Sequence, residues 1–148
     1  MIHLYDSNRL RVTPWRNGGG ETREIISYPP GSPDFDWRIS IATIAADGEF
    51  SSFPGIDRII TLLSGDVLLY RHGTLYQRLA LHQPFAFAGE EPIAARLCGQ
   101  TSTDFNLMAR RSAYHPAAGI TTARFAPASA VAGVVYVLAG QWQHQQTL

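Results

Sequence analysis

The chain has 148 residues, of which 45% are hydrophobic and 16% are charged, and its formal net charge at pH 7 is zero. This composition fits a single globular domain with a sizeable core and excludes a disordered chain. The balanced charge, without a basic stripe, argues against nucleic acid as a partner.

No feature of the sequence directs the chain to a membrane or out of the cell. The first residues, MIHLYD, carry no basic region followed by an apolar run, so no export signal is expected. The longest apolar stretch, residues 131–139, is too short to span a bilayer. Cys98 is the only cysteine, which excludes an internal disulfide. We therefore expect a cytoplasmic protein without a membrane partner.

The first informative segment in chain order is PWRNGGGETRE, residues 14–24. Its three consecutive glycines allow a sharp turn or a close approach to another surface. The groups around them are suited to gripping a small planar anion; they belong to Trp15, Arg16, Asn17, Gly18 and Arg23. Asn-Gly is also a common turn between strands, so a plain turn remains the alternative. No Lys-Ser/Thr follows the glycines, which excludes a P-loop.

Short β-type segments separated by Gly and Pro fill most of the remaining chain. Alternation in residues 37–42 places the apolar side chains on one face, and Arg38 and Ser40 on the other, which is expected to be solvated or to meet a ligand. Further strands are expected at residues 58–63, 67–70, 74–79, 84–88, 94–97, 104–110, 120–125 and 134–138. No long helical periodicity is present. The pattern predicts an all-β sandwich or barrel.

The C-terminal part of the chain is almost free of charge. From Ser112 onward the only formal charge is Arg124. Because a large exposed apolar segment promotes association, we expect this segment to be buried in the core or at a subunit contact. A homodimer through the C-terminal segment is the protein partner that follows from this expectation.

Four separated motifs carry a family resemblance. They are PWRNGGGETRE at residues 14–24, FDWRISIA at 35–42, ADGEFSSFPGIDR at 46–58 and DFNLMAR at 104–110. In this order they resemble the signatures of the HutD/Ves family, and the chain is closer to the Ves branch. The resemblance implies a cupin double-stranded β-helix, a jelly-roll barrel, with a second cupin-like half in full-length members. It implies one bicupin-like unit over residues 1–148, with the first barrel at roughly 12–110 and 111–148 as a partial, truncated second half.

The resemblance also indicates where a cupin metal would be bound. The expected glutamate position holds Arg58, the paired histidines would fall around residues 51–54, which contain none, and Pro92 stands where the distant histidine would lie. The five histidines show no pair at i,i+2 or i,i+4. A metal site needs several such ligands converging on one point. We therefore expect no metal and no cofactor.

Arg58 is the strongest candidate for a ligand-binding residue. If it points into the barrel, its guanidinium would hold a carboxylate by two parallel hydrogen bonds; the alternative is a structural ion pair with Asp57 or Asp36. In the 104–110 segment, alternate residues share one face, and its mixture of Asp, Asn and Arg favours a ligand or an interface. The complete candidate set is Trp15, Arg16, Asn17, Gly18, Arg23, Arg38, Asp57, Arg58, Asn106 and Arg110.

Three functions remain open at this point. The first is a metal-free cupin that binds a small carboxylate metabolite, with a regulatory role in stress or in histidine utilisation, as the resemblance implies. The second is a metal-independent isomerase or lyase, which a titratable acid or His in the cavity would favour. The third is a structural or assembly protein with a vestigial pocket, which a filled lumen would favour. No catalytic residue can be assigned from the sequence.

Overall fold

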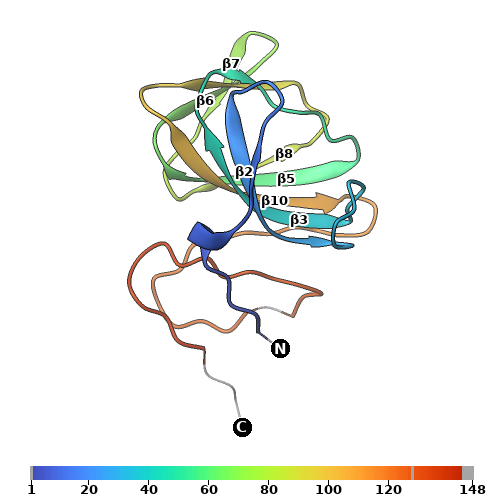
Figure 1. Cartoon of the computed structure of the whole chain (residues 1–148), viewed down its shortest axis with the longest axis vertical. Helices are drawn as coiled ribbons and strands as arrows, with labels where there is room; N and C mark the ends of the chain where they lie inside the picture. The colour runs from blue at the N-terminus through green and yellow to red at the C-terminus, as the bar shows by residue number, and fades with distance from the viewer. Residues whose placement is uncertain (1, 128, 145–148) are drawn as a thin grey trace.

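The strands form two antiparallel sheets that face each other (Figure 1). The computed structural model describes residues 2–127 and 129–144. The elements in chain order are η1 (Ser7–Arg9), β1 (Val12–Pro14), β2 (Gly20–Tyr28), β3 (Trp37–Ile44), β4 (Gly48–Glu49), β5 (Ile56–Ser64), β6 (Val67–Arg71), β7 (Thr74–Arg78), β8 (Pro84–Ala88), β9 (Ile93–Leu97) and β10 (Ser102–Arg110). The larger sheet has the order β1-β2-β3-β10-β5-β8, and the smaller has the order β4-β9-β6-β7. The predicted all-β jelly-roll architecture is confirmed.

Most predicted strands are confirmed. The main exception is β2, which begins in the glycine-rich segment. The segments predicted from residue 37 to residue 110 correspond to β3 and to β5 through β10. Strand β2 was not predicted, because its sequence was interpreted as part of a loop. It begins at Gly20 and pairs along β3, with Gly20 opposite Ile44 and Tyr28 opposite Trp37. Its bulge between Glu24 and Ile26 shifts the register.

The C-terminal segment differs from the prediction. Within its described residues, 111–127 and 129–144, no strand is formed, so the strands predicted at 120–125 and 134–138 are wrong. Residues with high β propensity form a strand only where a neighbouring strand offers backbone partners. The segment runs as coil beside the barrel (Figure 1), and the ring of Tyr136 lies 5.6 Å from that of Phe105.

The expected burial of this segment in the core is also wrong. Val131 is 85% exposed and Val135 is 60% exposed. The homodimer contact proposed for these side chains stays a prediction. No helix in the described part of the chain is long and apolar enough to cross a membrane.

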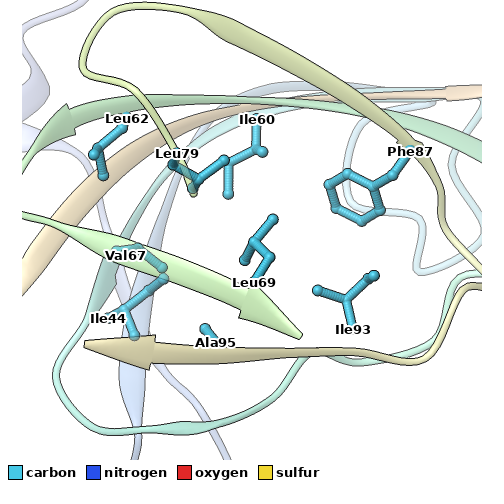
Figure 2. Packing of buried hydrophobic residues seen from close by; sticks show 9 residues of the cluster. All are labelled: Ile44, Ile60, Leu62, Val67, Leu69, Leu79, Phe87, Ile93 and Ala95. Atoms are coloured by element: carbon cyan, nitrogen blue, oxygen red, sulfur yellow. The ribbon is translucent and has the colours of Figure 1, made fainter. Parts of the chain in front are cut away.

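The principal core fills the space between the sheets. Strands from both sheets send apolar side chains toward one another (Figure 2), and the cluster comprises Ile44, Ile60, Leu62, Val67, Leu69, Leu79, Phe87, Ile93 and Ala95. A smaller cluster of Phe35, Ile56 and Met108 lies elsewhere in the barrel, with Phe53 packed against it. Burial of these side chains supplies the main favourable term in folding.

Two tight turns flank β6, one between β5 and β6 and one between β6 and β7. Between β6 and β7, His72 and Gly73 both have positive φ, 51° and 74°, as a tight hairpin with right-twisted strands requires. Gly65, directly after β5, has a φ of 92°, and a Cβ there would lie only 2.6 Å from the Cβ of Ser102. Glycine at position 65 therefore allows the start of β10 to lie close against the turn.

Candidate functional site

A row of polar side chains on β10 faces the interior of the barrel. Ser102, Asp104 and Asn106 are all less than 5% exposed, and Met108 continues the row. These residues alternate along the strand, so they lie on one face, which confirms the shared face predicted for Asp104, Asn106 and Met108 and extends it to Ser102. Buried polar groups are stable only when they bond to one another or to a ligand. The inner face of β10 is therefore a candidate binding site.

Arg58 points into this interior. It is 6% exposed, and its Nη2 donates to Asn106 Oδ1 at 2.9 Å. Among the residues that the structure describes, this is the only hydrogen bond of the guanidinium, and its buried Nε has no partner. The expected ion pairs with Asp57 or Asp36 are not formed within the described residues; these carboxylates bond to Arg111 and Arg110 instead.

Aromatic rings surround the guanidinium of Arg58. Its central carbon lies 4.9 Å from the ring centre of Phe87, 5.4 Å from that of Phe50 and 5.5 Å from that of Phe53. Each ring face attracts the cation, and together the rings exclude water from it. Burial lowers the pKa of Arg58 to about 10, an effect that the negative charge of Asp104 opposes and the positive charge of Arg38 reinforces. Arg58 thus remains a cation at neutral pH.

Asp104 is the second charged group of the interior. It is 1% exposed, its Oδ1 accepts a hydrogen bond from Asn106 Nδ2, and its Oδ2 is buried without a partner. Burial raises the pKa of this carboxyl from 3.8 to about 7, although Arg58 and the hydrogen bond from Asn106 both favour the charged form. Asn106 therefore bridges an arginine and an acid that titrates near neutrality.

Strands β2 and β3 extend the polar array toward solvent. Arg38 and Arg58 lie on either side of Met108 in the sheet register, which places their Cα atoms about 10 Å apart at two strand spacings. Ser40, 3% exposed, lies opposite Asn106. The side chain of Arg38 is 24% exposed and its Nε is 3.3 Å from Glu24 Oε1. The array thus runs from the buried Asp104 to the solvent-exposed Glu24.

The expected solvated face of β3 is wrong for Ser40 and only partly right for Arg38. The six-stranded sheet turns this polar face into the barrel. Its opposite face, with Ile39 and Ile41, is also less than 10% exposed. Alternation identified the two faces correctly but could not show which one faces inward, because both are covered.

The glycine-rich segment forms a turn, the plainer of the two interpretations. Asn17 Oδ1 accepts from the backbone N of Gly19 at 2.8 Å, and the carbonyl of Gly19 accepts from Ala45 and Ala46 at 2.8 and 3.1 Å. Gly18 has a φ of 73° and is exposed. These bonds fix the turn against the end of β3, so the Asn17 amide oxygen is engaged in the turn itself.

Trp15 lies against the barrel beside this turn. Its Nε1 donates to Thr22 Oγ1 at 2.7 Å, and it packs against the principal core. A Cβ at Gly20 would lie 2.8 Å from the Trp15 ring and 2.2 Å from the carbonyl oxygen of Thr43. Glycine at position 20 therefore lets the indole close over the start of β2, so Trp15 packs against the core.

The remaining candidates lie away from the interior array. Arg16 is exposed on the turn. Arg23 lies on the opposite face of β2, where its Nη1 donates to the carbonyl of Ser7 at 3.2 Å. Asp57 accepts from Arg111 Nε at 2.6 Å.

Arg110 is held at the end of β10 by Asp34 and Asp36, at 2.9 and 3.0 Å, and these bonds raise its pKa. Arg110 therefore belongs to an ion-pair network at the end of β10 and not to the polar array inside the barrel.

Two surface grooves lie beside some of these residues, one at Arg23 and one at Asp57. One, of about 370 Å³, is lined by Arg23, Thr43, His82, Thr103 and Tyr136 together with apolar side chains. The other, of about 330 Å³, lies beside β5 and β8 and is bordered by Asp57, Arg58, Ile59 and His115 among others. Neither is lined by Asp104, Asn106 or Arg38.

The interior array therefore unites three predicted residues, Arg38, Arg58 and Asn106, with three that were not in the predicted set. The additional residues are Glu24, Ser40 and Asp104. Asp104 could have been found from sequence, because it shares the alternating face of Asn106 in the 104–110 motif. No group of three or more His, Cys, Asp or Glu side chains in the described residues is arranged to hold a metal ion.

The two facing antiparallel sheets with this strand order define a cupin-type jelly roll. A cupin domain of a transcriptional regulator from Enterobacter cloacae superimposes with a TM-score of 0.51 at 17% identity, covering 62% of this chain and 96% of that domain. At such low identity the likeness shows the fold alone.

The HutD family model matches residues 7–148, and the chain belongs to the HutD family. Protein Ves of Cronobacter sakazakii is 47% identical over 96% of this chain and 79% of its own length, and Protein Ves of Citrobacter koseri is 45% identical over 96% and 75%. HutD from Pseudomonas fluorescens superimposes with a TM-score of 0.64 at 40% identity, covering 70% of this chain and 57% of that chain. The resemblance deduced from the four motifs is confirmed.

A conserved protein of unknown function from Pseudomonas aeruginosa gives a TM-score of 0.67 at 35% identity. The match covers 72% of this chain and 56% of that one. The superimposed part therefore spans little more than half of each of these two Pseudomonas chains.

Proposed function

We propose that this chain binds a small carboxylate in the interior of the barrel, with Arg58 as the principal contact. The observation that carries the proposal is a buried guanidinium that uses one of its donors on Asn106 and leaves Nε without a partner. A guanidinium offers five donors in a planar fork that matches a carboxylate. An anion that accepts from the free donors would satisfy groups that the protein leaves unpaired.

Arg38 supports the same assignment. Its positive charge lies close enough to Arg58 to lower the Arg58 pKa, so the two cations repel one another. An anion bound between them would relieve this repulsion and would interact with both. Ser40 and Asn106, on neighbouring strands between the two arginines, add a hydroxyl and an amide that can orient the ligand.

A second candidate function rests on Asp104. Its pKa of about 7 matches that of a general acid or base at neutral pH. This observation favours a metal-independent isomerase or lyase in which the arginines hold the substrate carboxylate and Asp104 moves a proton. Turnover of a bound carboxylate, lost in Asp104→Asn while binding persists, would establish this enzyme.

The third candidate is a structural protein in which Arg58 only fills the barrel. The three phenylalanine rings around its guanidinium give this candidate some support. It predicts that Arg58 variants lose stability and that no carboxylate stabilises the wild type.

Thermal unfolding against a panel of carboxylates tests the proposal. Formate is a natural first probe, because the Pseudomonas fluorescens HutD structure was obtained in a formate condition; glutamate, formylglutamate and urocanate complete the panel. A ligand at 100 times its Kd stabilises the folded state by about 2.7 kcal/mol. For a chain of this size that corresponds to a rise of roughly 5 to 10 °C in Tm.

Matched variants assign any shift to the interior. Arg58→Gln and Arg38→Gln should abolish or strongly reduce the ligand-induced rise, whereas Arg23→Gln, on the outer face of β2, should retain it. Absence of a shift across the panel at millimolar concentration would refute the binding function. If a carboxylate does bind, its identity distinguishes a role in stress from a role in histidine utilisation.

A further inference from the structure

Asp104 is a buried acid that the proposed carboxylate site does not need for direct contact. It occupies the innermost end of the array, with Asn106 between it and Arg58. Its unpaired Oδ2 distinguishes it from the other acids in the described residues, none of which has a buried oxygen lacking a hydrogen bond. The fold therefore places a second, negative group in an interior that is proposed to receive an anion.

The groups around Asp104 determine the net charge of the array. Its cross-strand neighbours are Ala42 on β3 and Leu62 on β5, and the facing sheet contributes apolar core side chains. The charged groups of the array are Arg38 and Arg58, which are positive, and Glu24, which lies beside Arg38 at the solvent-exposed end. With Asp104 ionised the array is neutral. With Asp104 protonated it carries a net charge of +1.

We propose that Asp104 couples the binding of a carboxylate in this interior to the uptake of one proton. The inference rests on the proposed function. The Asp104 carboxylate takes its proton from solvent and becomes a neutral carboxyl, while the incoming ligand stays ionised and bonds to Arg58. Asp104 thereby determines that the site receives its anion together with a proton.

The physical reason is that two negative charges cannot share this water-poor interior. A second anion near Asp104 disfavours its ionised form, because like charges raise the pKa of a carboxyl. Burial has already raised that pKa to about 7, so little further change is needed to keep the proton at neutral pH. Protonation of Oδ2 also removes a buried negative charge, and a neutral carboxyl without a partner costs less to bury than a carboxylate does.

Calorimetric titration with formate tests the coupling. Formate stays ionised from pH 6 to pH 9, so it contributes no protonation of its own. At pH 8, titrations in two buffers of different ionisation enthalpy should show close to one proton taken up per formate bound, and at pH 6 the uptake should be close to zero. The affinity should fall about tenfold between pH 7 and pH 8.5.

The Asp104→Asn variant should bind formate with an affinity that does not change over this pH range and without proton uptake. Should that variant fail to fold, the carbon-13 titration of the Asp104 carboxyl in the wild type replaces it. Saturating formate should raise the Asp104 pKa.

Two failures are distinguishable. Formate binding that depends on Arg58 but is independent of pH and takes up no proton overturns the coupling and leaves the carboxylate site in place. Absence of binding at pH 6, where Asp104 is neutral, by formate and by every other carboxylate of the panel overturns both. Proton uptake that persists in Asp104→Asn also overturns the coupling.

Discussion

Replacing Asp104 by Asn should remove a large pH dependence from the stability of this protein. The perturbation is nearly isosteric, and the amide can still accept from Asn106 through its oxygen. A folded-state pKa of about 7 against 3.8 for the ordinary carboxyl means that the folded state binds the proton more tightly than the unfolded state. The Asp104 carboxyl therefore destabilises the fold progressively as the pH rises from about 4 to about 7.

The magnitude follows from these two pKa values. At 1.36 kcal/mol per pH unit, the rise from 3.8 to about 7 corresponds to about 4 kcal/mol in the free energy of unfolding. About 3 kcal/mol of this should be lost between pH 4.5 and pH 8.5, since the unfolded carboxyl has already begun to ionise at the lower pH. The loss is complete a little above pH 7, and stability then stays level with respect to this group.

Urea unfolding followed by tryptophan fluorescence measures the effect. The free energy of unfolding of wild type minus that of Asp104→Asn should become more negative by about 3 kcal/mol from pH 4.5 to pH 8.5. The subtraction removes the contributions of other groups, including Glu90, whose pKa is lowered to about 2 by Arg111. A difference that stays constant over this range would show that Asp104 ionises normally, and the reasoning about its burial would be wrong.

Further predictions concern the parts that support the site. Gly20→Ala should destabilise the fold by about 1 to 3 kcal/mol, because a Cβ would strike the carbonyl oxygen of Thr43 and the Trp15 ring; Gly119→Ala, in open space, is the control, and equal melting temperatures would contradict the close packing. Trp15→Phe should lose about 1 kcal/mol with the hydrogen bond to Thr22, measured by urea unfolding. An unchanged midpoint would show that this bond does not contribute.

The strand pattern could be predicted from the sequence because alternation and turn residues are local signals. The segments of β3 and β5 through β10 carry these signals, including the His72-Gly73 turn between β6 and β7. Strand β2 was missed because glycines and charges at its start resemble a loop, and only pairing with β3 makes it a strand. Residues 134–138 have strand-like composition. They form no strand in the structure, because no neighbouring strand pairs with them.

The site was only partly predictable. The resemblance placed Arg58 at the position of the cupin glutamate and left open whether it points into the barrel, and in the structure it is 6% exposed and faces the interior. Its partner could not be deduced, because Asp104 and Asn106 are distant in sequence and meet Arg58 only through the pairing of β10 with β5. Asp57 and Asp36, which are nearer in sequence, are engaged by Arg111 and Arg110.

The location of a bound carboxylate tests the central claim most directly. A crystal structure of this chain should be determined with the panel carboxylate that raises the Tm most. We predict that both carboxylate oxygens lie about 3 Å from nitrogen atoms of Arg58 or Arg38, inside the barrel. A carboxylate bound instead in the outer groove beside Arg23 and His82, with the Arg58 guanidinium touching only protein atoms, would contradict it.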